Sequence, residues 1–125
     1  MSLVKFNLED RLVKFACFCL NVVELLPNDK AGQNLAFQLS KSCTASALIY
    51  GEAQAAESQA DFIHKMKMVL KEIRETRINL RIINEKPVLV NQAVVIALKE
   101  CNELLAIFLK SIETARRNQK LSSNK

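Results

Sequence analysis

Apolar residues recur along most of this chain in alternating steps of three and four, which is the spacing of one face of an α-helix. Four such seams can be followed, and they are separated by Pro27, by the segment 55–58 and by Pro87. The pattern predicts four helices and no strands. Helices with seams this regular pack antiparallel at crossing angles of about 20°. We therefore expect an all-α fold, an antiparallel up-down-up-down four-helix bundle over residues 1–118, followed by a flexible basic tail over 119–125.

Caps and prolines set the predicted helix bounds. The first helix is expected to begin after Asn7, a good N-cap residue, and the next two to occupy Ala31–Gln54 and Gln59–Asn84. Pro87 suits the first turn of the fourth helix, which we expect to fray after Ala115. The predicted seam residues, in chain order, are Leu8, Leu12, Phe15, Cys19, Val22, Leu26, Leu35, Leu39, Ser42, Ser46, Ile49, Ala53, Phe62, Met66, Val69, Ile73, Thr76, Leu80, Ile83, Val90, Val94, Ala97, Cys101, Leu104, Phe108 and Ile112.

The second helix is almost uncharged. Between Ala31 and Gln54 its charged residues are Lys41 and Glu52. A second stripe lies on the side away from its seam and consists of Phe37, Thr44, Leu48 and Ala55. A helix that is apolar all round is usually buried all round. A monomer of 125 residues cannot cover both faces, so we predict that Phe37, Leu48 and Glu52 lie at a contact with another subunit.

Glu52 is the lone acid of that helix. A carboxylate on an otherwise apolar helix needs a charged or hydrogen-bonding partner, because its burial is otherwise unfavourable. Either Lys65 or a basic residue of a neighbouring subunit could supply this partner. We favour a structural ion pair over a binding site, and we expect the pair to support assembly.

The composition favours long helices, and the sequence shows neither a signal-peptide pattern nor a membrane-spanning segment. Only two glycines and two prolines occur, and 50% of the residues are hydrophobic. The segment Met1–Asp10 carries Lys5 and Glu9 where a signal peptide needs an apolar core. No uncharged apolar segment reaches the roughly 18 residues that cross a bilayer. We expect a cytoplasmic protein with no membrane partner.

No catalytic or metal-binding motif stands out. His64 is the only histidine and has no metal-ligand partner one turn away, so we place it on a helix surface. Cys17, Cys19, Cys43 and Cys101 follow no zinc spacing and fall inside helical patterns, so we interpret them as core or interface residues. No Glu-x-x-His pair exists, which argues against a di-iron bundle. We expect a non-enzymatic protein without cofactor or metal.

Charge offers one surface of functional interest. The net charge of +5 permits an anionic partner without requiring one. One flank of the third helix is basic, and its residues are Lys67, Lys71, Arg74 and Arg81. Such a flank could bind phosphate groups. The alternative is that it is neutralised by acids of the same bundle, namely Glu72, Glu75, Glu100 and Glu103.

Residues between Gln38 and Ile83 also match a recurring bacterial pattern. They are Gln38, Leu39, Ser42, Ser46, Glu52, Ala53, Ser58, Asp61, Phe62, Lys65, Leu70, Lys71, Glu72, Glu75 and Leu80. This set resembles the small bacterial four-helix-bundle proteins encoded in intervening sequences of 23S ribosomal RNA genes. The resemblance implies a ring-shaped homopentamer. Related accessory variability proteins of diversity-generating retroelements form basic pentamers that bind nucleic acid and a reverse transcriptase.

Two functions follow from these patterns. The first is an oligomeric interaction or scaffold protein that docks another protein. The alternative is a ring-shaped oligomer that binds structured RNA, or DNA, through the basic flank of the third helix. No aromatic residue interleaves that flank, so base stacking is not supported. A flank that is exposed and free of acids would favour nucleic acid, and a flank consumed by ion pairs would favour the scaffold.

Overall fold

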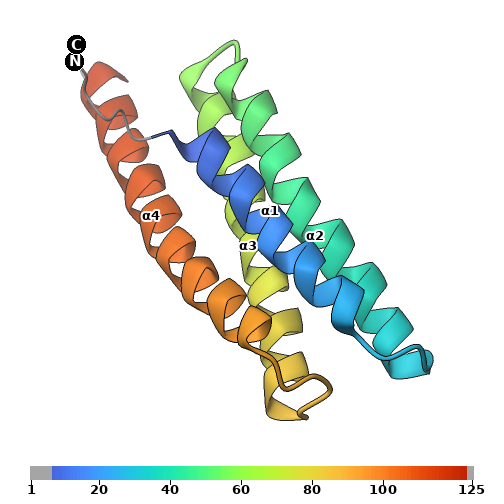
Figure 1. The fold of residues 1–125 in the computed structure, drawn as a ribbon. Helices are drawn as coiled ribbons and strands as arrows, with labels where there is room; N and C mark the ends of the chain where they lie inside the picture. Colours follow the sequence, from blue (N-terminus) through green and yellow to red (C-terminus); the bar gives the residue numbers. More distant parts are fainter. Residues whose placement is uncertain (1–6, 124–125) are drawn as a thin grey trace, which may run out of the picture.

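A computed structural model describes residues 7–123, which form four α-helices and no strand. Helix α1 spans Leu8–Leu25, α2 spans Lys30–Gln54, α3 spans Gln59–Glu85 and α4 spans Gln92–Ser123. Successive helices run antiparallel, and each helix packs against the two that neighbour it in the order α1, α2, α3, α4 and back to α1 (Figure 1). The predicted all-α up-down-up-down bundle is confirmed. Lys5 and the end of the predicted tail, 124–125, lie outside the described residues.

Polar caps fix where three of the helices begin. The side chains of Asn7, Asp29 and Ser58 each accept a hydrogen bond from the amide three residues further on, at 3.1, 2.7 and 3.0 Å. These bonds satisfy amides that have no partner within the helix. The turn from α1 to α2 also requires Gly32, because a Cβ there would overlap the carbonyl oxygen of Pro27. The first three helices therefore begin within one residue of their predicted starts.

The start of α4 differs from the prediction. The helix begins at Gln92, and Pro87 lies in the connection from α3 rather than in the first turn. Asn91 supplies the cap, because its side chain accepts a hydrogen bond from the amide of Ala93 at 2.8 Å. Val90, which was assigned to the seam, precedes this cap and is 85% exposed. The predictions of Pro87 in the first turn and of Val90 in the seam are therefore wrong, because Asn91 and not Pro87 caps the helix.

The end of α4 also differs from the prediction. The helix continues to Ser123, past residue 118 where the predicted bundle gives way to a tail. Gln59 at the start of α3 donates a hydrogen bond to the carbonyl oxygen of Ala115 at 3.2 Å, and Arg117 pairs with Glu113 one turn earlier at 2.9 Å. Because of this extension, the basic residues that follow Ala115 are presented on a helix.

The core is built from the predicted seams. Apart from Val90, every residue assigned to a seam is buried or partly buried. The hydroxyls of Ser42 and Thr76 lie 2.8 Å apart between α2 and α3, which satisfies the polar groups of the core. The ring of Phe108 meets Tyr50 edge to face, with 5.7 Å between ring centroids. This core holds the four helices in one register.

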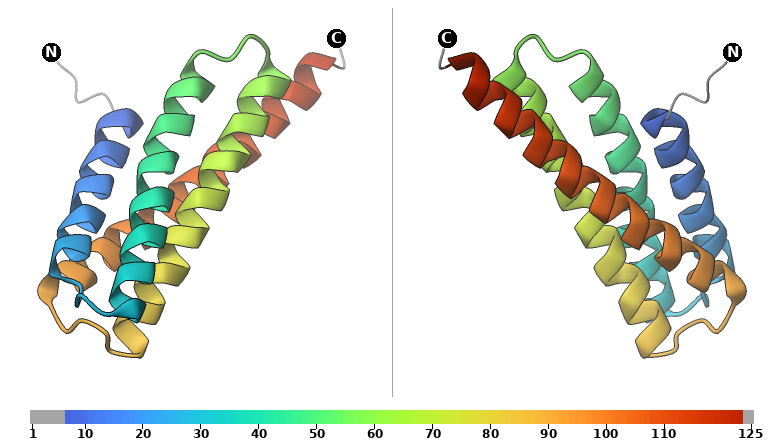
Figure 2. Two further views of the ribbon diagram at one scale, coloured as in Figure 1. Left: turned by 90° about the vertical axis from the view of Figure 1, so that its right-hand side faces the viewer. Right: turned by 90° about the vertical axis from the view of Figure 1, so that its left-hand side faces the viewer.

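Helix α4 runs obliquely to the rest of the bundle. Figure 2 shows its C-terminal end diverging from α1 while it stays beside α3. Its two sides therefore meet different surroundings. One side faces α1 near the middle of the bundle, and the other follows α3 and borders a groove.

Candidate binding groove

A depression lies on the outer surface between α3 and α4. It has a volume of about 850 Å³ and is open to solvent. It is lined by Lys67, Leu70, Lys71, Arg74, Glu75 and Ile78 of α3 and by Leu109, Ile112, Glu113 and Arg116 of α4. Apolar and charged residues thus share one surface.

The floor of the groove is aliphatic. Leu70 and Ile112 are nearly buried at 7% and 6% exposure, whereas Ile78 and Leu109 remain 55% and 47% exposed. The groove shares Ile78 with a second depression of about 470 Å³ further along α3, which is also lined by Arg81, Ile82, Glu85 and Lys86. The second depression therefore extends the exposed aliphatic surface along α3, from Ile78 to Ile82. Exposed aliphatic surface rimmed by polar groups is typical of an interaction site.

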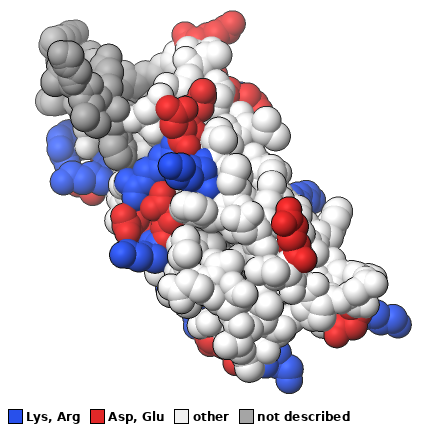
Figure 3. All heavy atoms as spheres, viewed as in Figure 1, with Lys and Arg blue, Asp and Glu red and all other residues white. Residues whose placement is uncertain are grey.

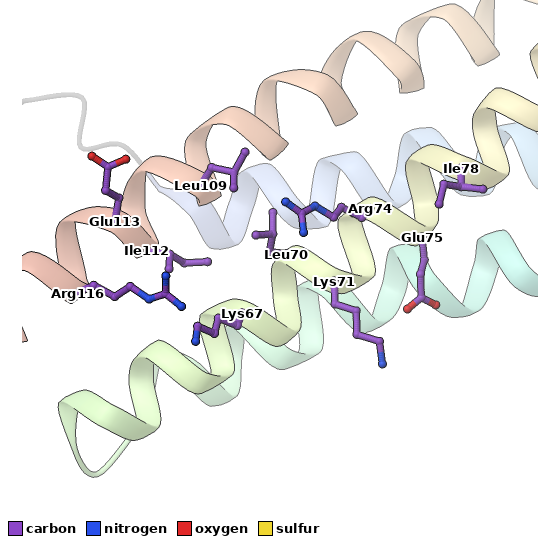
Figure 4. Close-up of a pocket in the computed structure, with 10 residues that line it drawn as sticks. All are labelled: Lys67, Leu70, Lys71, Arg74, Glu75, Ile78, Leu109, Ile112, Glu113 and Arg116. Atoms are coloured by element: carbon purple, nitrogen blue, oxygen red, sulfur yellow. The ribbon is translucent and has the colours of Figure 1, made fainter.

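Three basic side chains reach into the gap between the helices. Figure 4 shows Lys67 and Arg74 projecting from α3 toward α4, and Arg116 projecting from α4 toward α3. We call these three residues the groove cations. The carboxylates of Glu75 and Glu113 point away from the gap. Within residues 7–123, none of the groove cations forms an ion pair.

The predicted basic flank is only partly brought together here. Lys67, Lys71 and Arg74 line the groove, whereas Arg81 lies in the second depression and pairs with Glu85 at 2.7 Å. Arg116 was not among the predicted site residues. It joins the groove because α4 packs beside α3 at this point, and no pattern within one helix signals that packing.

Two of the acids considered as partners of this flank are engaged elsewhere. Arg11 of α1 contacts Glu100 through Nε and Nη2 at 2.7 and 2.9 Å, and Nη2 also contacts Glu103 at 2.8 Å. The hydrogen bond with Glu100 is the main reason that the pKa of Arg11 lies above its usual value. Neutralisation of the basic flank by Glu100 and Glu103 is therefore contradicted, because α4 turns both acids toward α1.

Glu72 of α3 does not line the groove and is partly buried. Burial raises the pKa of its carboxyl group above the usual range, and the negative charge of Glu75 adds to this shift. The positive charges of Lys71 and Lys41 act in the opposite direction. Lys71 therefore interacts electrostatically with Glu72, although the two form no ion pair among the described residues.

The predicted subunit-contact residues all lie on the surface. Phe37 and Leu48 are 63% and 70% exposed. Glu52 pairs with Lys65 of α3 at 3.2 Å, so one of its two proposed partners is in place within the chain. The Glu52 side chain is itself 58% exposed. Its burial, and that of the two apolar residues, stays a prediction that depends on a second subunit.

The remaining candidate residues follow their structural interpretation. His64 is exposed on α3. Cys19, Cys43 and Cys101 are buried whereas Cys17 is exposed, and burial raises the pKa of Cys101 to about 12. No group of three or more His, Cys, Asp or Glu side chains in residues 7–123 is placed to hold a metal ion.

None of the helices within residues 7–123 has the length and apolar character needed to cross a membrane.

Comparison with solved structures shows a likeness in fold. The chain superimposes on the crystal structure of a protein of unknown function from the S23 ribosomal protein family of Bacteroides thetaiotaomicron, with a TM-score of 0.77 and 24% sequence identity. The match covers 85% of this chain and 98% of that one. No protein-family model and no curated protein matches the chain. The likeness shows a shared fold.

Proposed function

We propose that this protein acts by binding rather than by catalysis, as an oligomeric scaffold that docks another protein. The observation that carries this proposal is the pair of exposed apolar side chains on α2, Phe37 at 63% and Leu48 at 70%. Figure 3 shows that much of the face over α1 and α2 is uncharged, with a few acidic and basic side chains scattered across it. Such a surface is more stable when a second molecule covers it.

The resemblance to proteins encoded in 23S ribosomal RNA intervening sequences supports self-association as a ring-shaped homopentamer. The likeness in fold to an S23 family protein is consistent with that membership. In this proposal the protein has no reaction of its own, needs no cofactor and works in the cytoplasm.

The test is sedimentation velocity of the purified chain at micromolar concentration. We expect the wild type to sediment as an oligomer and the variant Phe37→Gln/Leu48→Gln as a monomer. Val90→Gln/Leu121→Gln serves as the matched control, because these side chains are 85% and 59% exposed and lie outside α2. A monomeric wild type, or an oligomer that both double variants leave intact, would rule out assembly through α2.

A second candidate function is binding of structured RNA. The observation that favours it is that Lys67, Lys71 and Arg74 lie together without an ion pair in the described part of the chain. The ion pair of Arg81 with Glu85 and the aliphatic floor of the groove favour the scaffold instead. Contacts to phosphate would be expected to weaken steeply with salt.

This candidate is tested by titrating the protein with a structured RNA and a duplex DNA at low and near-physiological salt. Binding through the flank predicts salt-sensitive affinity that is lost when Lys67, Lys71, Arg74 and Arg81 are changed to Glu. The control changes four other exposed basic residues to Glu, which are Lys14, Lys30, Lys99 and Lys110. Equal loss in both variants would indicate only a general charge effect.

A further inference from the structure

We propose that the groove between α3 and α4 of one copy receives helix α1 of a second copy. This inference rests on the proposed self-association and names the two surfaces that meet. The contact is head-to-tail, because a different surface of each copy takes part. Three observations support it: the surface pattern of α1, its match to the groove in charge and length, and the position of the two surfaces on the bundle.

The outer face of α1 carries acids at both ends and less polar residues between them. The residues are Glu9, Val13, Cys17, Leu20 and Glu24, all of them exposed, and we call them the α1 stripe. Steps of three and four residues keep them on one face of the helix. Val13 is 51% and Leu20 is 36% exposed. Within residues 7–123, neither Glu9 nor Glu24 forms an ion pair.

The groove has the complementary order of groups. The groove cations stand at one end, Lys86 stands at the other, and the aliphatic side chains of Ile78 and Ile82 lie between them. Cations would thus face the acids of the α1 stripe while apolar residues face Val13 and Leu20. Pairing of opposite charges around an apolar centre gives such an interface its specificity.

The two surfaces also agree in length. With a rise of 1.5 Å per residue, Glu9 and Glu24 lie about 22 Å apart along α1. The same rise puts Lys67 and Lys86 about 28 Å apart along α3. Both acids of the α1 stripe can therefore meet cations at the same time.

The two surfaces lie on opposite sides of the molecule. Because α1 packs against α2 and α4, whereas α3 packs against α2 and α4, α1 and α3 are diagonal in the bundle. A copy that places its α1 in one neighbour therefore leaves its own groove open for the next. Repetition of this contact closes into a ring when the rotation between copies permits it. Phe37 and Leu48 are exposed on α2, the helix that packs beside α1.

The experiment is a charge exchange between the two surfaces, followed by sedimentation velocity at near-physiological salt. The groove variant is Lys67→Glu/Arg74→Glu/Lys86→Glu, which reverses cations at both ends, and the stripe variant is Glu9→Lys/Glu24→Lys. Each alone places like charges opposite one another, and we expect each to weaken self-association by about 100-fold or more. Both sets of changes in one chain restore opposite charges, and we expect that chain to assemble again.

The control variant is Lys30→Glu/Lys99→Glu/Lys110→Glu, which changes the net charge as much as the groove variant but at exposed positions outside the groove. It should assemble as the wild type does, and circular dichroism should show all variants to be helical. The inference is overturned if the combined variant stays monomeric, or if both reversals leave assembly intact while Phe37→Gln/Leu48→Gln abolishes it. In that second case the proposed scaffold stands, whereas a monomeric wild type would remove both.

Discussion

Helix α4 has two sides that differ in how their charges are satisfied. Toward α1, the guanidinium of Arg11 bonds to Glu100 and Glu103 at 2.7–2.9 Å, and the side chains of Arg11 and Glu100 are only 25% and 16% exposed. Toward α3, the groove cations have no ion-pair partner among residues 7–123, and two aliphatic side chains beside them are about half exposed.

The contrast separates a structural contact from a surface that is ready for a partner. On the α1 side, one guanidinium bonds to two carboxylates of the same chain, so the contact contributes to the stability of the single chain. On the α3 side, uncompensated cations beside an apolar floor contribute little to folding. These cations and the apolar floor can instead interact with a molecule that presents acids beside apolar groups.

The largest expected effect compares two leucines of α4. Leu104 is fully buried in the core, and Leu104→Ala should lower the free energy of unfolding by about 2–5 kcal/mol because a cavity remains. Leu109 borders the groove at 47% exposure, and Leu109→Ala should lower it by less than about 1 kcal/mol. Urea unfolding at a concentration where the protein is monomeric measures both. A loss at Leu109 as large as that at Leu104 would show the groove to be part of the core.

The next effect compares two arginines. Arg11→Ala leaves Glu100 half-buried without its partner and should destabilise the monomer by about 2 kcal/mol. This is less than for a fully buried pair, because water still reaches both side chains. Arg74→Ala should change stability by no more than about 0.5 kcal/mol, since Arg74 is exposed and makes no ion pair in the described chain. Equal midpoints of denaturation for the two variants would remove the distinction between the two sides of α4.

The difference between the two sides also explains what could be predicted from the sequence. Helical periodicity depends on neighbours within one helix, so the seams and the buried residues followed directly from it. The pairing of Arg11 with Glu100 depends on the axial register of α1 relative to α4. No local sequence pattern predicts that register. Arg116 was missed for the same reason, because only the oblique course of α4 brings it beside Lys67.

Helix bounds show the same limit. Asn7, Asp29 and Ser58 are local signals and were sufficient for three helices. At α4 two local signals competed, since both Pro87 and Asn91 suit a helix start. The helix begins after Asn91, because the side chain of Asn91 caps the amide of Ala93.

The smallest expected effect concerns pH and belongs to Glu72, a partly buried acid of α3. Burial raises the pKa of its carboxyl group above the usual value of 4.5, so the folded chain holds this proton more tightly than the unfolded chain. The stabilising contribution of that proton is fully present below pH 4.5 and is lost as the pH rises through the raised pKa. Glu72→Gln cannot lose a proton, and its stability relative to the wild type should therefore increase over this pH range.

Lys71 provides the sharper form of this test, because its charge lowers the pKa of Glu72 against the effect of burial. Lys71→Ala should move the titration midpoint of Glu72 upward, as followed by the carboxyl carbon shift in NMR. Lys30→Ala, at an exposed position on α2, is the control and should leave the midpoint unchanged. A midpoint that does not move in Lys71→Ala would show that the lysine is screened by water. Arg11 offers no comparable titration, because its guanidinium stays charged across this pH range.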